Sequence, residues 1–201
     1  MKINLPTKIT ILRLILTFLI LILLCVPFSS FGITFPKYDV NGVIVQLHYI
    51  IAGVIFIVAS LTDFLDGYLA RKYNQVTDTG KMLDAICDKA LVNPILVVLA
   101  VKGFVPVFVP VIIILRDIIV DAIKMEAASK GKVVAAIKSG KLKTASMMVG
   151  LVLVFFYNIP FEFINVRVDL FLLFLATILS VISAFQYYSL NKSIIFGKDN
   201  K

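Results

Sequence analysis

The sequence predicts an all-α integral membrane protein with six membrane-spanning helices and both termini in the cytoplasm. Three observations support this fold class: 60% of the 201 residues are hydrophobic, the mean hydropathy is +1.01, and apolar runs of helix length recur along the chain. Soluble domains contain only about 45–50% apolar residues. Because a helix needs about 20 apolar residues to cross a bilayer, this chain accommodates roughly six spans with short connections.

The apolar runs place the expected spans in order along the chain. They lie near residues 9–27, 48–71, 82–101, 105–125, 144–158 and 170–190. The fifth run is short, so we expect its helix to include neighbouring residues. Too little sequence remains for a soluble domain, and we therefore expect one membrane domain over residues 1–201.

The residues before the first run are expected to form an N-terminal interfacial segment. A cleaved signal peptide is the alternative, because Lys2 and Lys8 precede the apolar run. However, the run to Val26 is longer than the apolar core of a usual signal peptide, and no A-x-A-like site follows it. We favour a retained segment, in which Arg13 anchors the helix at the level of the lipid headgroups.

Basic residues are distributed unevenly between the two sides of the expected membrane. With the N-terminus inside, six spans place Lys37, Lys102 and Arg167 outside, and the other seventeen of the twenty basic residues at or towards the inner face. This asymmetry follows the positive-inside rule. The net charge of +8 is therefore attributed to a multi-pass topology in the cell membrane, and no nucleic-acid partner is expected.

The connection from Pro27 to Gln46 is rich in proline and glycine and is expected to be irregular, with no function assigned. His48 is the only histidine, and no acid or cysteine is spaced to join it in a metal site, so we expect an interfacial residue. Cys25 and Cys87 lie in apolar runs, where a free thiol behaves as a small hydrophobic group.

Acids and glycines recur at fixed spacing in the second and third expected helices. The pattern is Asp63-x2-Asp66-Gly67-x2-Ala70-Arg71-x8-Gly80-x3-Asp84-x3-Asp88. At 3.6 residues per turn, the first two acids share a helix face with Gly67 and Ala70, and the last two share one with Gly80. Two such helices could aim all four carboxylates at one point. Because these charges would repel one another, they predict a site for hard cations, two Mg²⁺ or Mn²⁺ ions.

This motif resembles the signature of the CDP-alcohol phosphotransferases, D-x2-D-G-x2-A-R-x8-G-x3-D-x3-D, and meets every fixed position. The family consists of membrane enzymes that make phospholipid head groups. The resemblance implies that an acceptor hydroxyl attacks the β-phosphoryl group of a CDP-linked lipid and that CMP leaves. It implies Asp63, Asp66 and Asp84 as metal ligands, and Asp88 as a ligand of the second metal, a general base, or both. It also implies a homodimer.

Four smaller or basic residues of the motif are expected to contact the CDP moiety. Gly67 and Ala70 leave room for a nucleotide to approach the helix, although helix–helix packing is the alternative. Arg71 offers donors to phosphate oxygens or to an aspartate. Gly80 either begins the third helix or permits close approach of the nucleotide.

The acceptor is indicated by a second resemblance. The segment Lys138-Ser139-Gly140-Lys141-Leu142-Lys143-Thr144 resembles the G-K-x-K-T segment of phosphatidylglycerolphosphate synthases, and Asn4 to Arg13 resembles their N-terminal segment. In those enzymes the lysines are taken to hold the phosphate of glycerol 3-phosphate. The resemblance therefore implies that CDP-diacylglycerol and glycerol 3-phosphate are the substrates and that phosphatidylglycerol phosphate is the product. Alternatively, Lys138, Lys141 and Lys143 are ordinary inner-face residues that contact anionic lipid.

Arg116 is a further candidate for the acceptor phosphate. It lies within an apolar run, next to Asp117 and five residues before Asp121, and a charge at membrane depth indicates a functional site. Arg116 either reaches the acceptor or pairs with Asp121.

Two alternative functions stay open at this point. The same chemistry could use inositol phosphate, inositol, serine or phosphatidylglycerol as the acceptor. A divalent-cation transporter could use the acids as a permeation site, but it would need a polar path through both leaflets. The acids gather towards the inner side and the outer halves of the expected spans are apolar, which favours an enzyme.

Overall fold

The computed structural model describes the backbone of residues 5–72, 78–132, 134–135 and 137–195, and the side chains of residues 9–62, 86–132, 134–135 and 137–192. This part of the chain contains six α-helices, two 3-10 helices and one β-hairpin. The α-helices are α1 (Leu5–Cys25), α2 (Leu47–Lys72), α3 (Asp78–Val101), α4 (Phe108–Ser129), α5 (Lys138–Phe155) and α6 (Val168–Ile195).

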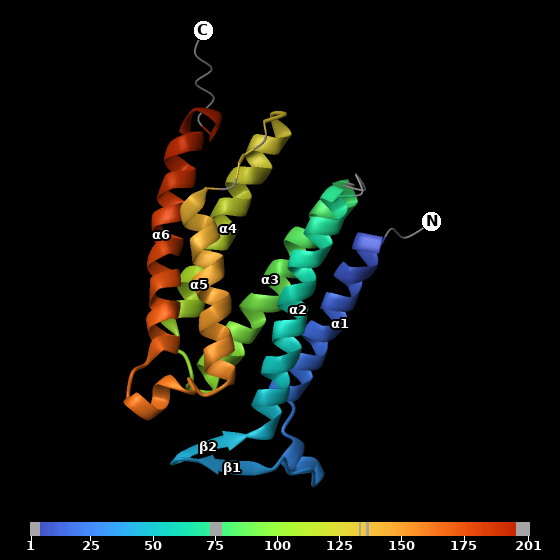
Figure 1. Cartoon of the computed structure of the whole chain (residues 1–201). Coiled ribbons are helices and arrows are strands. Elements are labelled where there is room, and N and C mark those ends of the chain that lie inside the picture. Colours follow the sequence, from blue (N-terminus) through green and yellow to red (C-terminus); the bar gives the residue numbers. More distant parts are fainter. Residues whose placement is uncertain (1–4, 73–77, 133, 136, 196–201) are drawn as a thin grey trace.

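The helices form two groups, and all of them lie roughly along a common direction (Figure 1). Consecutive helices are antiparallel. In the first group α1 packs against α2 and α3, and in the second α6 packs against α4 and α5. Contacts of α2 with α5 and of α3 with α4 join the groups. The six helices match the six expected spans in number and order.

The hydrophobic core occupies the half of the bundle that lies next to the hairpin. All six helices contribute to it, and its fully buried members include Ile20, Phe56, Leu99, Ile113, Leu151 and Leu173. Gly53 allows α2 to approach α5 closely, since a Cβ atom at this position would lie 2.7 Å from the Cβ atom of Phe155.

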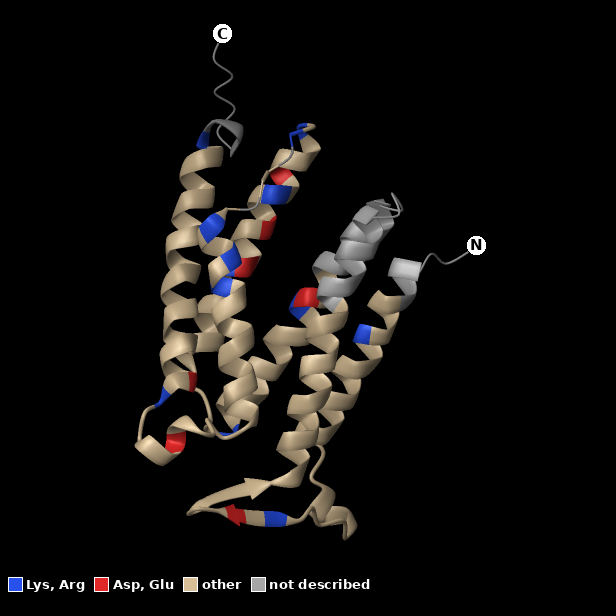
Figure 2. Ribbon diagram, viewed as in Figure 1, with Lys and Arg blue, Asp and Glu red and all other residues tan. Residues whose placement is uncertain are grey.

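Large apolar side chains also cover the outside of the bundle. Phe18, Ile118 and Phe185 are 65%, 60% and 71% exposed, and a soluble protein rarely exposes so extensive an apolar surface. Figure 2 shows an uncharged band along the helices, between charged residues in one half of the bundle and others near the hairpin end. Among the described residues, one helical segment, Val168–Lys192, is long and apolar enough to cross a membrane, and two shorter apolar helices are Ile9–Cys25 and Leu47–Thr62.

The helices α5 and α1 both begin before their apolar runs. α5 begins at Lys138, so it includes neighbouring residues as expected, because lysine is a good helix former and the basic segment continues the apolar run as one helix. The expected interfacial segment is continuous with α1 from Leu5 onwards; residues 1–4 lie outside the described part of the chain.

The connection between α1 and α2 is ordered, so the expectation of an irregular segment was wrong. It contains a 3-10 helix (Phe28–Phe31) and an antiparallel hairpin of β1 (Lys37–Val40) and β2 (Val43–Gln46). Asn41 and Gly42 form the turn, with φ values of 52° and 88°. A two-residue turn with positive φ at both positions matches the twist of antiparallel strands, and Asn-Gly favours it. The Gln46 N–H donates to the Tyr157 hydroxyl at 3.1 Å, which ties the hairpin to the connection after α5.

Candidate active site

The motif residues lie on two consecutive helices. α2 carries Asp63, Asp66, Gly67, Ala70 and Arg71, and α3 carries Gly80, Asp84 and Asp88. Only Asp88 has its side chain within the described part of the structure; the other seven side chains lie outside it. The helical backbone gives the acids of each helix the spacing that places them on one face. Their convergence on a single point stays a prediction.

The chemistry of the motif fits a divalent cation. The chain between α2 and α3 comprises residues 73–77, so the end of α2 and the start of α3 lie within about 20 Å of each other. Four carboxylates on these two helices are the hard oxygen ligands that Mg²⁺ and Mn²⁺ prefer. Among the side chains that the structure describes, no group of three acidic, histidine or cysteine residues is arranged to hold a metal.

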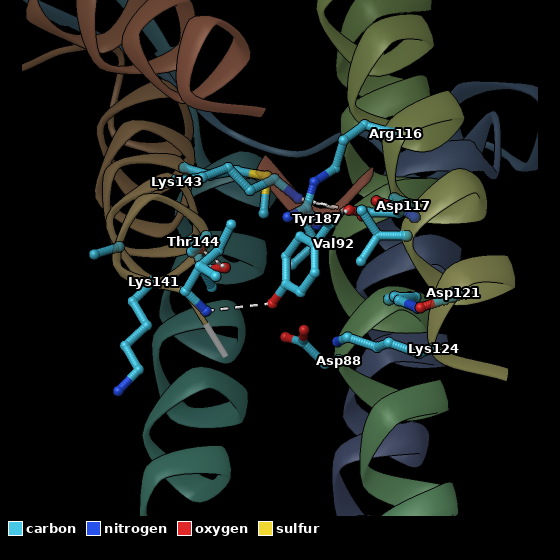
Figure 3. Close-up of a pocket in the computed structure, with 17 residues that line it drawn as sticks. Asp88, Val92, Arg116, Asp117, Asp121, Lys124, Lys141, Lys143, Thr144 and Tyr187 are labelled. Atoms are coloured by element: carbon cyan, nitrogen blue, oxygen red, sulfur yellow. Dashed lines mark hydrogen bonds and ion pairs between the residues drawn. The ribbon is translucent and has the colours of Figure 1, made fainter. Parts of the chain in front are cut away.

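A cavity of about 500 Å³ lies beside Asp88, bounded by α3, α4, α6 and the first turns of α5 (Figure 3). We call it the basic pocket. Its charged lining residues are Asp88, Lys89, Arg116, Asp117, Asp121, Lys124, Lys141 and Lys143. Five of these are basic and three are acidic, which leaves a net charge of +2. This balance complements a phosphate monoester, whose charge is about −2 at neutral pH.

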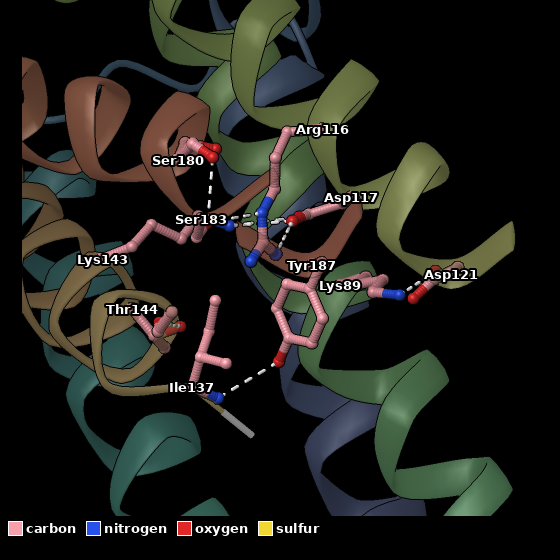
Figure 4. Close-up of polar contacts among 11 residues, drawn as sticks. Lys89, Arg116, Asp117, Asp121, Ile137, Lys143, Thr144, Ser180, Ser183 and Tyr187 are labelled. Atoms are coloured by element: carbon pink, nitrogen blue, oxygen red, sulfur yellow. Dashed lines mark hydrogen bonds and ion pairs between the residues drawn. The ribbon is translucent and has the colours of Figure 1, made fainter. Parts of the chain in front are cut away.

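Asp117 organises the two most buried cations of the basic pocket (Figure 4). The Lys143 ammonium donates to both carboxylate oxygens of Asp117, at 2.9 and 3.3 Å, and the Arg116 guanidinium donates to one of them at 3.0 Å. Lys143 and Asp117 are only 3% and 6% exposed. A buried cation requires such a partner, and one carboxylate shared between two cations leaves a local charge of +1.

Arg116 is also fixed by α6. Its Nε–H donates to the Ser183 hydroxyl at 3.0 Å, and its guanidinium carbon lies 5.5 Å from the centre of the Tyr187 ring. The Lys124 ammonium lies 5.5 Å from the centre of the same ring. Cations at this distance from an aromatic face are attracted by its quadrupole. Tyr187 therefore places two cations on the walls of one cavity.

The first turns of α5 form another wall of the basic pocket. The residue before α5, Ile137, provides no side-chain cap, and its N–H donates to the Tyr187 hydroxyl at 3.4 Å. Gly140 lies close to Arg116, since a Cβ atom there would be 3.5 Å from a terminal guanidinium nitrogen. The uncapped N-terminal N–H groups and the dipole of a helix favour anions. The N-terminus of α5 thus adds to the positive potential of the pocket.

The four expected acceptor residues differ in their placement. Lys143 and Arg116 point into the pocket, whereas the Lys141 side chain lines its edge and points away from Tyr187 and Asp117 (Figure 3). Lys138 is exposed and does not line the pocket. The alternative pairing of Arg116 with Asp121 was wrong, because Arg116 pairs with Asp117 and Asp121 pairs with Lys89 of α3.

Asp117, Lys89 and Tyr187 were not expected to contribute to the site. Asp117 was noticed only as the neighbour of Arg116, although a second charge in the same apolar run was a usable signal. Lys89 directly follows the last motif acid, and its pairing with Asp121 joins α3 to α4. Nothing in the sequence near Tyr187 indicates its role, because the residues it contacts lie on α4 and before α5.

Arg13 is fully buried on α1, so its expected position at the lipid headgroups was wrong. Buried polar residues Thr10 and Thr17 lie one turn on either side, and the Thr17 hydroxyl donates to the Arg13 carbonyl at 2.8 Å. α1 packs against both α2 and α3, the two helices that carry the motif acids. A guanidinium buried in this position belongs to the polar interior of the bundle.

The similarity of this chain to known proteins extends beyond the motif. The model of the CDP-alcohol phosphatidyltransferase family matches residues 3–186. A Bacillus subtilis protein named CDP-diacylglycerol–glycerol-3-phosphate 3-phosphatidyltransferase is 34% identical over 94% of this chain and 95% of its own length. Proteins of the same name from Shigella flexneri and Mycoplasma genitalium are 34% and 40% identical, over 94% and 53% of this chain and 95% and 45% of their own lengths.

The match to the family therefore includes α1 to α5, most of α6, the complete motif and every lining residue of the basic pocket except Tyr187. The chain belongs to the CDP-alcohol phosphatidyltransferase family.

Proposed function

We propose that this protein transfers a phosphatidyl group from CDP-diacylglycerol to glycerol 3-phosphate, giving phosphatidylglycerol phosphate and CMP. Full-length similarity to proteins named for this activity supports the reaction. The basic pocket beside Asp88 carries the choice of acceptor. A phosphorylated acceptor needs a cationic site, whereas serine or free inositol gains little from one.

In this proposal Lys143 and Arg116 bind the phosphate of glycerol 3-phosphate. Asp117 holds both cations in place and neutralises one of them, so the pocket attracts an anion without two unpaired buried charges. The N-terminus of α5 adds N–H donors on the same side. Lys141 and Lys138 act from the edge, by raising the local concentration of anions. Binding at this position leaves the acceptor hydroxyl to face the motif acids on α2 and α3.

CDP-diacylglycerol is assigned to the motif side of the site. Gly67, Ala70, Arg71 and Gly80 are proposed to contact its CDP moiety. Members of the family generally use a divalent metal, and we propose two Mg²⁺ or Mn²⁺ ions held by Asp63, Asp66, Asp84 and Asp88. Such ions neutralise phosphate charge and stabilise the attacking and leaving oxygens of a displacement at phosphorus.

Asp88 is proposed to receive the proton of the acceptor hydroxyl. The acceptor oxygen forms a bond to the β-phosphorus, the bond from that phosphorus to the CMP oxygen breaks, and CMP leaves with the electron pair. The carboxylate lines the basic pocket from α3, between the proposed donor and acceptor sites. A carboxylate can accept this proton only in its ionised form.

The proposed setting is the cell membrane, with six spans and the active site facing the cytoplasm. The uncharged band of the helices and the exposed apolar side chains support this orientation of the bundle. The basic residues of α4 and α5 then lie on the inner side, as the positive-inside rule requires. A homodimer is proposed by analogy with the family.

CMP release from CDP-diacylglycerol in detergent micelles tests the proposal. Purified protein receives Mg²⁺ or Mn²⁺ and one acceptor at a time: glycerol 3-phosphate, inositol phosphate, inositol, serine or phosphatidylglycerol. We expect release with glycerol 3-phosphate and none after the metal is removed with EDTA. Release with a different acceptor would overturn the assignment of glycerol 3-phosphate. No release from folded, metal-supplied protein with any acceptor would overturn the proposed reaction.

A further inference from the structure

A second cavity lies at the other end of the bundle, next to the hairpin. Its volume is about 440 Å³, and it is formed by the end of α1, the connection that follows, the start of α2 and Lys102 after α3. We call it the hairpin cavity. It shares no lining residue with the basic pocket. The proposed reaction uses none of its residues.

Aromatic contacts and backbone hydrogen bonds fix the walls of the hairpin cavity. The rings of Phe28 and Phe35, and those of Phe35 and His48, lie 5.2 Å apart between their centres, so the connection is stacked onto the start of α2. The Leu47 N–H donates to the Pro36 carbonyl at 3.1 Å and closes the base of the hairpin. Walls held in this way form a permanent cavity, which is what a binding site requires.

The lining of the hairpin cavity is cationic. It includes Lys37 and Lys102 and contains no acidic residue. Among the described residues, neither lysine forms an ion pair. The acid on the same hairpin, Asp39, does not line the cavity, and its carboxylate accepts the Gly42 N–H at 2.7 Å. Two lysines facing one cavity repel each other unless an anion lies between them.

Lys37 and Lys102 lie at the end of the bundle that carries few basic residues. Among the basic residues that the structure describes, only Lys37, Lys102 and Arg167 lie at this end, which is the outer side in the proposed topology. Arg167 is already paired, because its guanidinium donates to the two carboxylate oxygens of Asp169 at 3.1 and 3.0 Å. The remaining two cations both line one cavity. A membrane protein that places few cations outside has little reason to gather them without a ligand.

His48 adds a polar group that lacks a partner. It lines the cavity, and its Nδ1 atom is buried with no hydrogen-bond partner among the described residues. The hydroxyls of Ser29 and Thr34 lie in the same lining. Because the Nδ1 atom has no accessible surface, a ligand in the cavity would instead hydrogen-bond to the hydroxyls of Ser29 and Thr34.

We propose that the hairpin cavity binds the phosphate group of an anionic phospholipid. Lys37 and Lys102 would neutralise the phosphate, and the hydroxyls of Ser29 and Thr34 would hydrogen-bond to the headgroup. The apolar part of the lining, which includes Leu23, Leu24 and Phe28, would contact the glycerol backbone and the first carbons of the acyl chains. In the proposed topology the cavity lies at the level of the outer headgroups. Free phosphate offers the same anionic chemistry without the apolar contacts.

Binding of short-chain lipids and of phosphate to the full chain is measured in a neutral detergent. The probes are dihexanoyl phosphatidylglycerol, dihexanoyl phosphatidylcholine and inorganic phosphate, and the readouts are the apparent Kd and the ligand-induced change in Tm. The test variant is Lys37→Gln/Lys102→Gln. Its matched control is Lys130→Gln/Lys132→Gln, which removes two exposed lysines at the opposite end. A Lys37→Arg/Lys102→Arg variant keeps both charges and is expected to bind as the wild type does.

We expect the anionic lipid to bind the wild type and the control, and its apparent Kd to rise roughly tenfold or more in Lys37→Gln/Lys102→Gln. Without ligand, that variant should keep its CMP release and a Tm no lower than the wild type, because two repelling charges are gone. If the two substitutions raise the apparent Kd for the anionic lipid but inorganic phosphate shows no such dependence, the cavity is a lipid site. The same dependence with inorganic phosphate identifies free phosphate as the ligand and overturns the lipid assignment. An unchanged Kd in the variant, or equally tight phosphatidylcholine binding, overturns the proposal. None of these outcomes depends on the acceptor of the enzyme.

Discussion

The two halves of the molecule contribute opposite charges to the candidate active site. α2 and α3 carry four acids at fixed spacing, whereas α4 and α5 carry Arg116 and Lys143, which Asp117 holds together. The acids are arranged by the repeat of single helices, and the cations by contacts among three helices. In the proposed site, an acidic wall formed by the motif acids would hold metal, and a basic wall formed by Arg116 and Lys143 with Asp117 would hold an anion. Together the two walls would bring two phosphate groups to one place. Metal ions on the acidic wall would neutralise the phosphates of CDP-diacylglycerol, and the cations of the basic wall would neutralise the phosphate of glycerol 3-phosphate. The repulsion between the two substrates would therefore be reduced.

Loss of Asp88 is the largest expected effect, because this acid lies where the two walls meet. Asp88→Asn keeps the size of the side chain but removes its charge and basicity. We expect the rate of CMP release to fall by about 10²–10⁴-fold, the usual contribution of a general base. The measurement is steady-state release of CMP with glycerol 3-phosphate.

Asp39→Asn is the matched control for that variant. Asp39 lies on the exposed hairpin and accepts one backbone hydrogen bond, which an asparagine oxygen can also accept. Its CMP release should equal that of the wild type. Equal activity of Asp88→Asn and wild type would remove Asp88 from the mechanism.

Loss of Asp117 should weaken the basic wall by lowering the stability of the folded protein. Asp117→Asn leaves Lys143 buried without its carboxylate, and removal of one partner from a buried ion pair costs about 3–5 kcal/mol. We expect a clear fall in Tm in detergent, with weaker binding of glycerol 3-phosphate.

The double variant Asp117→Asn/Lys143→Gln separates these effects. With both charges gone, no buried lysine lacks a partner, so the Tm should recover towards that of the wild type. Binding of the acceptor should stay weak. A double variant whose Tm lies below that of Asp117→Asn would contradict the pairing.

Lys143 and Lys141 provide a comparison within the basic wall. Lys143→Gln should raise the KM for glycerol 3-phosphate by about tenfold or more, because it loses a charge-assisted hydrogen bond. Lys141→Gln should change it by about threefold or less, since an exposed charge that points away from the pocket is screened by solvent. The KM for CDP-diacylglycerol serves as the internal control. The reverse order of effects would mean that Lys141 is the main acceptor ligand.

Tyr187→Phe is expected to have the smallest effect. The variant keeps the ring that faces Arg116 and Lys124 but loses the hydroxyl that accepts the Ile137 N–H at 3.4 Å. A hydrogen bond of 3.4 Å lies at the weak end of the usual range of about 0.5–1.5 kcal/mol, so the KM for glycerol 3-phosphate should rise by about twofold with little change in kcat. Tyr187→Leu removes the ring as well and should raise the KM further.

The helices that carry the motif acids could be predicted from the sequence, and the convergence of their carboxylates stays a prediction. The basic wall could be predicted only in part. A helix repeats every 3.6 residues, so the spacing of Asp84 and Asp88 alone places them on one face. Lys143 was found through its local segment. Its partner Asp117 lies 26 residues earlier on another helix, and no local pattern connects the two. Tyr187 contributes through contacts with distant segments, which single-sequence periodicity does not encode.

The fold shows the same division. Apolar runs predicted six helices in the correct order, because burial and lipid exposure both require apolar residues. The hairpin was missed, although Asn41 and Gly42 are a strong turn signal, because the flanking strands span only four residues each. Arg13 was placed at the headgroups since an arginine near a helix end usually lies there. Its burial depends on the packing of α1 against α2 and α3, which the local sequence does not encode.

Binding of radiolabelled glycerol 3-phosphate tests most directly whether the basic wall holds the acceptor. Asp88→Asn protein is used with CDP-diacylglycerol and metal present, so that little ligand is consumed. We predict saturable binding that inorganic phosphate displaces and glycerol does not. Adding Lys143→Gln should weaken it by about tenfold or more, and adding Lys192→Gln, an exposed lysine of α6, should not. Displacement by glycerol alone, or unchanged binding after Lys143→Gln, would contradict the assignment of this wall.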